Sequence, residues 1–270
     1  VFFAYPDHEE IDAIVSDVVR LAPEYDFVAA DGIGHQLWVI REPELISRLE
    51  TLFATNIPFT YVADGHHRTA AAAGVGTKRA QANPAHTGME EYNYFLAVHF
   101  PADQLTIIDY NRVVKDLNGM SNKDFLDKLE AAFEIEKKGK EVHKPDDLHN
   151  FGLYLSGGWY SLTAKDGTYD DNDPIGQLDV TVLSEHVLAP LLDITDLRKS
   201  RRIDFVGGIR GLKELERRVD SGEMKAAFAL YPVSMEQLME IADTNNIMPP
   251  KTTWFEPKLR SGLVIHKLED

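Results

Sequence analysis

The sequence contains no cysteine, which excludes disulfide bonds, thiolate metal ligands and a cysteine nucleophile. It also lacks an apolar run of the roughly 20 residues that a bilayer-spanning helix needs. No basic segment followed by an apolar stretch marks the chain for export. These absences favour a cytoplasmic protein without a membrane partner, whose chemistry relies on oxygen and nitrogen side chains.

Basic residues are few: 28 Lys and Arg stand against 44 Asp and Glu, giving a formal net charge of −16. A field of this sign opposes the approach of nucleic-acid phosphates, so we expect no nucleic-acid partner. The 270 residues include 44% hydrophobic and 27% charged residues, the proportions of ordinary globular proteins. This length suits one large domain or two modest ones.

The order of apolar patterns predicts an α/β fold with α+β tendency, in which helices flank a mixed sheet. In the first half a strand, a helix, a hairpin, a helix and a second strand follow one another from Val1 to Ala63. In the second half we expect a hairpin over residues 151–164, a helix over 180–192 and strands at 203–206 and 224–231. The stretch 134–144, rich in Lys and Glu, is expected at the surface and marks a soft boundary between regions 1–134 and 135–270.

Two further expectations concern the middle of the chain. Gly74-Val75-Gly76 is expected to end the helix that starts near residue 66, which leaves residues 78–89 as an exposed loop able to cover a site. Residues 92–100 and 105–110 are expected to form a hairpin of buried strands.

The most informative segment is the pentapeptide Asp64-Gly65-His66-His67-Arg68, called here the 64–68 turn. It follows the apolar run 59–63, typical of a buried strand, and precedes a helix. At such a junction the free backbone N–H groups and the positive end of the helix dipole point at the same space. Gly65 permits close approach of a phosphate, Arg68 offers a bidentate guanidinium, and Thr69 adds a hydroxyl. The segment therefore predicts a phosphate site.

Several roles are open for the charged members of the turn. Asp64 either holds Mg²⁺ or accepts a substrate proton, and His66 or His67 acts as general acid-base or as a hydrogen-bond donor. The alternative is structural: Asp64 caps the helix, and the histidines satisfy local hydrogen bonds. A zinc site is disfavoured because adjacent histidines on a helix point about 100° apart.

A second group of candidates lies in the C-terminal half. Asp204, Gly207, Gly208 and Arg210 form another strand-to-turn junction able to bind an anion, with a plain tight turn as the alternative. Lys251 and Lys258 lie in a Pro-rich, aromatic stretch that either reaches the pocket or serves packing.

The 64–68 turn after an apolar strand, the segment 202–208 and the segment 248–259 together resemble a bacterial family of unknown function, number ten-fifteen among such domain families. That family is similar in its motif to the archaeal free-serine kinase, and more distantly to the ParB and sulfiredoxin fold. The resemblance implies a ParB/sulfiredoxin-like core with a C-terminal extension and a kinase-like site at Asp64, His66, His67 and Arg68. Family members look longer at the N-terminus, so we expect an upstream segment to complete the site.

The relatives differ in chemistry that the sequence tests. Sulfiredoxin-like reduction needs a cysteine in the turn, where His66 stands instead, so that activity is excluded. A ParB-like switch would add a DNA-binding helical region, for which the acidic second half offers no basic recognition helix.

The functional hypothesis is a nucleotide-dependent phosphotransferase that uses ATP or ADP with Mg²⁺ and acts on a small hydroxyl compound such as a free amino acid. The alternatives are a non-catalytic nucleotide or anion sensor and a metal-dependent phosphate-ester hydrolase. The sequence is compatible with an oligomer as well as with a monomer.

Overall fold

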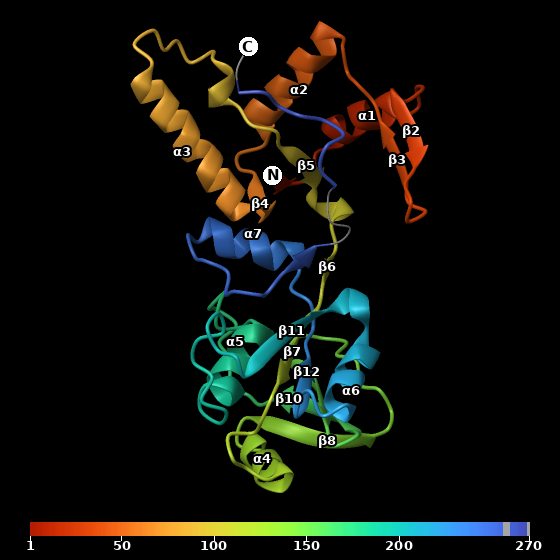
Figure 1. Ribbon diagram of the computed structural model, residues 1–270, viewed down its shortest axis with the longest axis vertical. Coiled ribbons are helices and arrows are strands. Elements are labelled where there is room, and N and C mark those ends of the chain that lie inside the picture. The colour runs from red at the N-terminus through yellow and green to blue at the C-terminus, as the bar shows by residue number, and fades with distance from the viewer. Residues whose placement is uncertain (256–259, 269–270) are drawn as a thin grey trace. The chain divides into compact units, whose positions relative to one another are not determined.

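The computed structural model describes residues 1–255 and 260–268. It divides into two compact units: unit 1 comprises Val1–Leu105 with Leu259–Asp270, and unit 2 comprises Thr106–Lys258. Each unit is described by itself, with the element labels of Figure 1. Among the described residues, no helix combines the length and the apolar character needed to cross a membrane.

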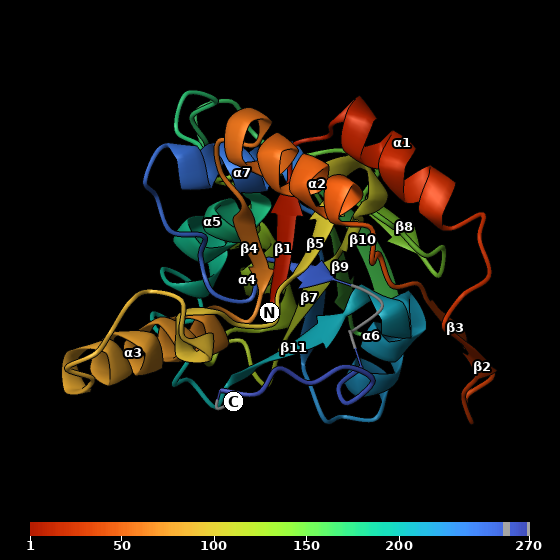
Figure 2. The same cartoon turned by 90° about the horizontal axis from the view of Figure 1, so that it is seen from above.

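Unit 1 is built on a three-stranded mixed sheet in the order β4-β1-β5, visible from above in Figure 2. The fully buried β1 (Phe2–Tyr5) pairs antiparallel with β4 (Tyr61–Asp64) and parallel with β5 (Val98–Pro101). Helices α1 (Glu9–Val18) and α2 (Pro43–Asn56) contribute apolar side chains to a small core. That core contains Tyr5, Ile11, Ile14, Leu52 and Ile57. Parallel and antiparallel pairing in one sheet confirms the predicted mixed α/β class.

The hairpin of β2 (Tyr25–Val28) and β3 (Gly34–Leu37) forms as predicted, with every residue of β2 exposed. Helix α3 (His66–Ala82) differs from the prediction, because it continues through Gly74 and Gly76 instead of ending there. A helical glycine costs only about 1 kcal/mol relative to alanine, and the alanine-rich neighbours favour the helix. A Cβ at Gly76 would lie 3.0 Å from the Tyr92 carbonyl oxygen, so this glycine permits a close approach. Residues 78–82 are therefore helix, and the predicted covering loop is shorter.

The hairpin predicted over residues 92–110 was wrong. β5 pairs with β1 at the other end of the sequence, and β6 (Ile107–Ile108) pairs with β13 (Trp254–Phe255). Strand propensity identified extended segments here but carried no information about their partners, because pairing is decided by tertiary packing.

Unit 2 contains a six-stranded sheet in which all neighbouring strands are antiparallel, in the order β11-β7-β12-β9-β10-β8. The predicted 151–164 hairpin is confirmed as β9 and β10. The strands are β7 (Tyr110–Val114), β8 (Phe133–Gly139), β9 (Asn150–Leu155), β10 (Gly158–Ala164), β11 (Ile203–Gly207) and β12 (Ala226–Ala229).

Both faces of this sheet are buried, because alternate residues of a strand point to opposite sides. Val114 belongs to a large cluster with α4 (Asn122–Leu129) and α5 (Asp179–Leu183), whereas Val113 belongs to a second cluster with α6 (Leu212–Asp220). The Ser121 side chain caps α4 as its sequence suggests, and Ser234 caps α7 (Met235–Asp243) through a capping box.

The Lys- and Glu-rich stretch lies at the surface as expected, with Glu134, Glu136 and Lys137 exposed. It contains β8, an edge strand whose charged side chains suit an exposed edge. The boundary expected after residue 134 falls within this strand. The helix expected over 180–192 stops being α-helical at Leu183 and continues as a π-helix, Ser184–Leu188.

Candidate functional site

The 64–68 turn forms where β4 ends at the edge of the unit 1 sheet. Tyr61 and Ala63 are buried and fix the strand, and Asp64 is its last residue. Gly65 takes a left-handed conformation, φ 102°, and occupies the N-cap position of α3. A Cβ at Gly65 would lie 3.0 Å from an Arg68 guanidinium nitrogen, so both the backbone angle and the space favour glycine.

The first turn of α3 presents unpaired backbone donors. The first hydrogen bond of this helix runs from the Thr69 N–H to the Gly65 carbonyl at 2.9 Å. The N–H groups of His66, His67 and Arg68 therefore have no carbonyl partner within the helix. The Thr69 hydroxyl donates to the same Gly65 carbonyl at 3.1 Å and thereby stabilises the turn. This geometry suits an anion at the helix N-terminus.

Asp64 and Arg68 form an ion pair across the turn, with the guanidinium Nη2 donating to Asp64 Oδ2 at 3.2 Å. The Asp64 side chain is 46% exposed and that of Arg68 is 63% exposed. Among the described residues, the hydrogen bond that Asp64 accepts through its side chain comes from Arg68 and not from a backbone N–H of the helix. An exposed ion pair contributes at most about 1 kcal/mol, so Arg68 is able to exchange Asp64 for a phosphate.

His66 and His67 are exposed, and neither has a hydrogen-bond partner in the part of the chain that the structure describes. Their imidazoles are free to meet a ligand. No group of three or more His, Cys, Asp or Glu residues suited to a metal occurs among residues 1–255 and 260–268. Asp64 thus stands as a single carboxylate, which for Mg²⁺ would be completed by waters and substrate phosphates.

The same end of the sheet carries an exposed apolar segment that the sequence analysis missed. Phe2 lies opposite Asp64 on one side and Val98 on the other, and the Val1 nitrogen donates to the Leu96 carbonyl at 3.1 Å. The segment Tyr94–Leu96 leads into this end, with its three side chains 50%, 39% and 45% exposed. The sequence pattern predicted a buried strand for this aromatic run. The one contrary signal was that apolar and polar residues do not alternate along it.

The second group of candidates, in unit 2, shows mainly packing contacts. Asp204 accepts from the Arg218 guanidinium at 2.7 Å. A Cβ at Gly207 would lie 2.8 Å from the Trp254 ring, and one at Gly208 would collide with the Asp109 carboxylate. These glycines allow close approach of neighbouring groups. Arg210 ends the single 3₁₀ turn Gly208–Arg210 and is exposed.

Lys251 has the strongest local features of this second group. Its backbone is left-handed, φ 61°, and its carbonyl accepts a 2.8 Å hydrogen bond from the buried Arg112. Its ammonium lies 5.6 Å from the centre of the Tyr110 ring and 5.9 Å from that of Phe205. Lys258 lies outside the described residues. The structure therefore brings residues 64–69 together in unit 1 and Asp204, Gly207, Gly208, Arg210 and Lys251 along one region of unit 2.

Comparison with known proteins gives one family. The sequence model of the family described as "Protein of unknown function (DUF1015)" matches residues 1–181. No curated protein matches the chain. A solved structure of free serine kinase in complex with AMP is similar at 13% identity and a TM-score of 0.39, covering 94% of this chain and 83% of the other. A conserved hypothetical protein from Pyrococcus furiosus is similar at 16% identity and a TM-score of 0.38, covering 94% and 86%.

Proposed function

The chain belongs to the DUF1015 family, and we propose that it is a nucleotide-dependent phosphotransferase acting on a small hydroxyl compound. The observation that carries this proposal is the set of free N–H groups at His66, His67 and Arg68, which follow the left-handed Gly65. A helix of 17 residues supplies a full dipole behind these donors. Phosphate is the ligand that this arrangement binds best.

The side chains of the 64–68 turn have separate roles in phosphoryl transfer. Arg68 leaves Asp64 and binds the transferred phosphate, which spreads its charge over the guanidinium. Asp64, once released, either binds Mg²⁺ carried by ATP or ADP or accepts the proton of the acceptor hydroxyl. One of the two histidines donates to the same phosphate, since adjacent helical side chains diverge by about 100°.

The exposed segment Tyr94–Leu96 supports a nucleotide as the phosphate donor. Asp64 ends β4 and Leu96 lies two residues before β5, at the same end of the sheet and on either side of β1. Two strand spacings separate them by about 10 Å. A nucleotide bound by its phosphates at the turn reaches this segment with its base. The flat faces of Tyr94 and Phe95 then offer a stacking surface.

The test is calorimetric titration of ATP, ADP and CTP with Mg²⁺, combined with a phosphate-transfer assay on a panel of amino acids that begins with serine. We expect nucleotide binding and transfer by the full chain, with loss of at least about tenfold in affinity for Arg68→Ala. Arg20→Ala is the matched control, because Arg20 forms a comparable exposed pair with Asp17 at 3.0 Å in the same unit. Its affinity should equal that of the unmodified chain.

Two other functions would give different results in this test. A sensor binds nucleotide but phosphorylates no member of the panel, and a phosphate-ester hydrolase releases inorganic phosphate without any acceptor. Either result would refute the phosphotransferase. Absence of binding to all three nucleotides, or unchanged binding by Arg68→Ala, would refute the phosphate site itself.

A further inference from the structure

Unit 2 contains a cavity of about 590 Å³ beside the junction of α5 and the π-helix, at a distance in sequence from every residue of the 64–68 turn. Its apolar lining is formed by Ile175, Val180, Ala189, Ile194, Leu197, Pro249 and Pro250. A neighbouring cavity of about 360 Å³ shares Ile175, Thr181 and Glu185 with the first. A pocket of this size with mostly apolar walls is suited to a small molecule.

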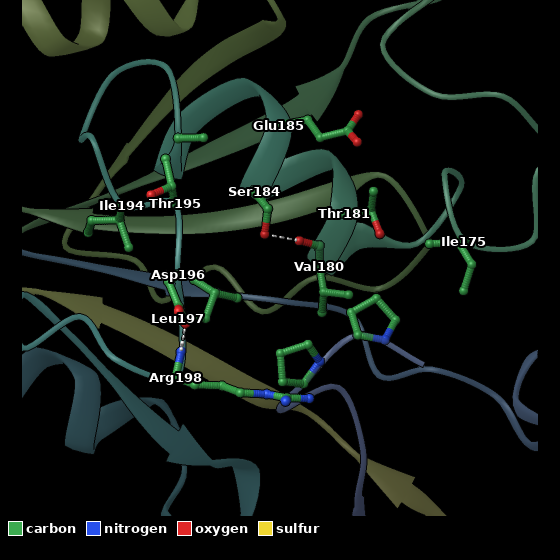
Figure 3. Close-up of a pocket in the computed structure, with 13 residues that line it drawn as sticks. Ile175, Val180, Thr181, Ser184, Glu185, Ile194, Thr195, Asp196, Leu197 and Arg198 are labelled. Atoms are coloured by element: carbon green, nitrogen blue, oxygen red, sulfur yellow. Dashed lines mark hydrogen bonds between the residues drawn. The ribbon is translucent and has the colours of Figure 1, made fainter. Parts of the chain in front are cut away.

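The helical wall of the cavity has an uncommon geometry. The Ala189 N–H donates to the Ser184 carbonyl at 2.9 Å, a bond that spans five residues and widens the helix. Such π turns are rare and are frequent at functional sites. The Ser184 hydroxyl donates a hydrogen bond to the Val180 carbonyl at 2.6 Å. Figure 3 marks this bond with a dashed line. Ser184 therefore stabilises the wall and is not free for a ligand.

Two polar groups on this wall lack partners among the described residues. The Thr181 hydroxyl oxygen is fully buried and makes no hydrogen bond. Glu185, one turn later on the same face, is exposed, and it has no ion pair or hydrogen bond with another described residue. Figure 3 shows both projecting from the helix. A buried hydroxyl without a partner costs about 1–3 kcal/mol, and a ligand that hydrogen-bonds to it recovers this energy.

The other carboxylates around the two cavities are already engaged by backbone N–H groups. Asp170 accepts from Asn172, Asp173 from Ile175, and Asp196 from Arg198, each at 2.9 Å. Backbone hydrogen bonds lower the pKa of Asp170 and Asp196, so these groups remain negative at neutral pH. Within residues 1–255 and 260–268, Arg198, on the loop opposite the helix, is the single lysine or arginine that lines either cavity. The surroundings therefore favour a positive ligand.

A metal ion does not fit this distribution of charge. The described residues contain no cluster of three or more possible metal ligands, so the carboxylates are too dispersed to coordinate one ion. An organic cation needs only one carboxylate, together with apolar walls for its body. The overall charge of −16 also favours the approach of a cation.

We propose that this cavity binds a small aliphatic amine, whose ammonium group donates to the Glu185 carboxylate while its hydrocarbon body packs on Ile175, Ile194 and the two prolines. The Thr181 hydroxyl, which is buried in the unliganded wall, accepts from the same ammonium once its side chain rotates toward the cavity. The site is separate from the proposed phosphate site and does not depend on it. Arg198 does not hold this ligand. Its guanidinium would repel a second positive charge carried by the ligand.

The test uses n-hexylamine, titrated calorimetrically into the full chain at neutral pH, with 1-hexanol and hexanoate as neutral and negative analogues of equal length. We expect hexylamine to bind at least about tenfold more tightly than either analogue, because the charged hydrogen bond to Glu185 is lost in both. Equal binding of hexanoate and hexylamine, or no binding of hexylamine, would overturn the proposal.

Variants identify the groups involved. Glu185→Gln should weaken hexylamine binding at least about tenfold and Thr181→Val about threefold to tenfold, with Arg198→Gln unchanged or tighter. The matched control is Glu240→Gln, an exposed helical glutamate of the same unit that lines neither cavity. Thermal unfolding of each variant establishes that it is folded, and a folded Glu185→Gln that binds hexylamine like the unmodified chain would refute the assignment.

Discussion

Unit 1 places its candidate site on a three-stranded sheet, whereas unit 2 has six strands with buried clusters on both faces. Helix α3, which presents the phosphate-binding N–H groups, has 17 residues and none of them is buried. In α6 of unit 2, by contrast, Leu215, Arg218 and Val219 are buried within 9 residues. The two units therefore differ in what holds their helices in place.

The difference shows that the 64–68 turn is positioned by local backbone interactions more than by a core. Gly65 sets the chain direction, Thr69 makes two hydrogen bonds to the Gly65 carbonyl, and Asp64 is fixed by its pairing with Phe2. Ligand-binding elements are commonly drawn from regions of low local stability. The following predictions test this contrast, beginning with the largest expected effect.

The largest effect is expected from matched leucine truncations in the two cores. Leu153→Ala removes a fully buried side chain from the large cluster of unit 2 and should lower its free energy of unfolding by about 3–5 kcal/mol. Leu52→Ala in unit 1, where the side chain is 8% exposed in a five-residue cluster, should cost about 2 kcal/mol. Hydrogen exchange in increasing urea measures both units separately. Equal losses would contradict the contrast.

The next effect is the pH dependence that Asp179 gives to unit 2. Burial raises the pKa of Asp179 to about 7 from 3.8, although the His149 N–H and Arg112 oppose the shift. Because the folded state holds this proton more tightly than the unfolded state, stability is greatest at low pH and falls as the pH rises through 7. The expected loss between pH 5 and pH 8 is about 2–3 kcal/mol.

Asp179→Asn is the control for this pH dependence, since an amide cannot titrate. The difference in unfolding free energy between the variant and the unmodified chain, measured in urea at several pH values, isolates the contribution of Asp179. A flat difference across this range would show that the carboxylate is ionised throughout. The hydrogen-exchange rates of the unit 1 amides should be the same in the variant and in the unmodified chain.

A smaller effect is expected from two glycines in and before α3. Gly65→Ala imposes a Cβ on a left-handed backbone beside Arg68 and should destabilise unit 1 by about 1–2 kcal/mol, with loss of nucleotide binding. Gly74→Ala has open space and an ordinary φ, so it should stabilise the helix by about 0.5–1 kcal/mol and leave binding intact. Circular dichroism and calorimetry compare the pair. Loss of binding in Gly74→Ala would argue against a site restricted to the turn.

The smallest effect concerns the proposed stacking surface. Tyr94→Ala should weaken ATP binding by about threefold to tenfold and leave the affinity for inorganic phosphate unchanged. Val75→Ala, which truncates an exposed apolar side chain in the middle of α3, is the control. If Tyr94→Ala changes both affinities equally, the segment supports the fold of the turn and does not contact the base.

Local sequence signals predicted much of the fold. The 151–164 hairpin forms as β9 and β10, and the hairpin and helix expected before Ala63 form as β2–β3 and α2. Each of these features depends on residues close together in the sequence. The α/β class with a mixed sheet followed from their order.

Features that depend on distant partners were not predictable in the same way. The extended character of residues 98–108 was evident, but β5 pairs with β1 and β6 with β13, across 96 positions of sequence (Phe2 to Val98) and 146 positions (Ile108 to Trp254). The turn itself was predicted because its residue types and its geometry are both local. The exposed Tyr94–Leu96 segment escaped because aromatic character alone does not distinguish a buried strand from a free surface.

The short ladder of β6 and β13 has a consequence for how the chain is organised. Ile107 lies opposite Phe255 and Ile108 opposite Trp254, so the strand that leads into unit 2 is hydrogen-bonded to the strand that leads out of it. Unit 2 is therefore inserted into unit 1 through a stem whose two sides are adjacent, as insertions that fold independently require. A change of length in a distant loop of unit 2 does not alter the separation of these two sides. The stem thus allows the loops of unit 2 to vary in length while its two ends stay side by side.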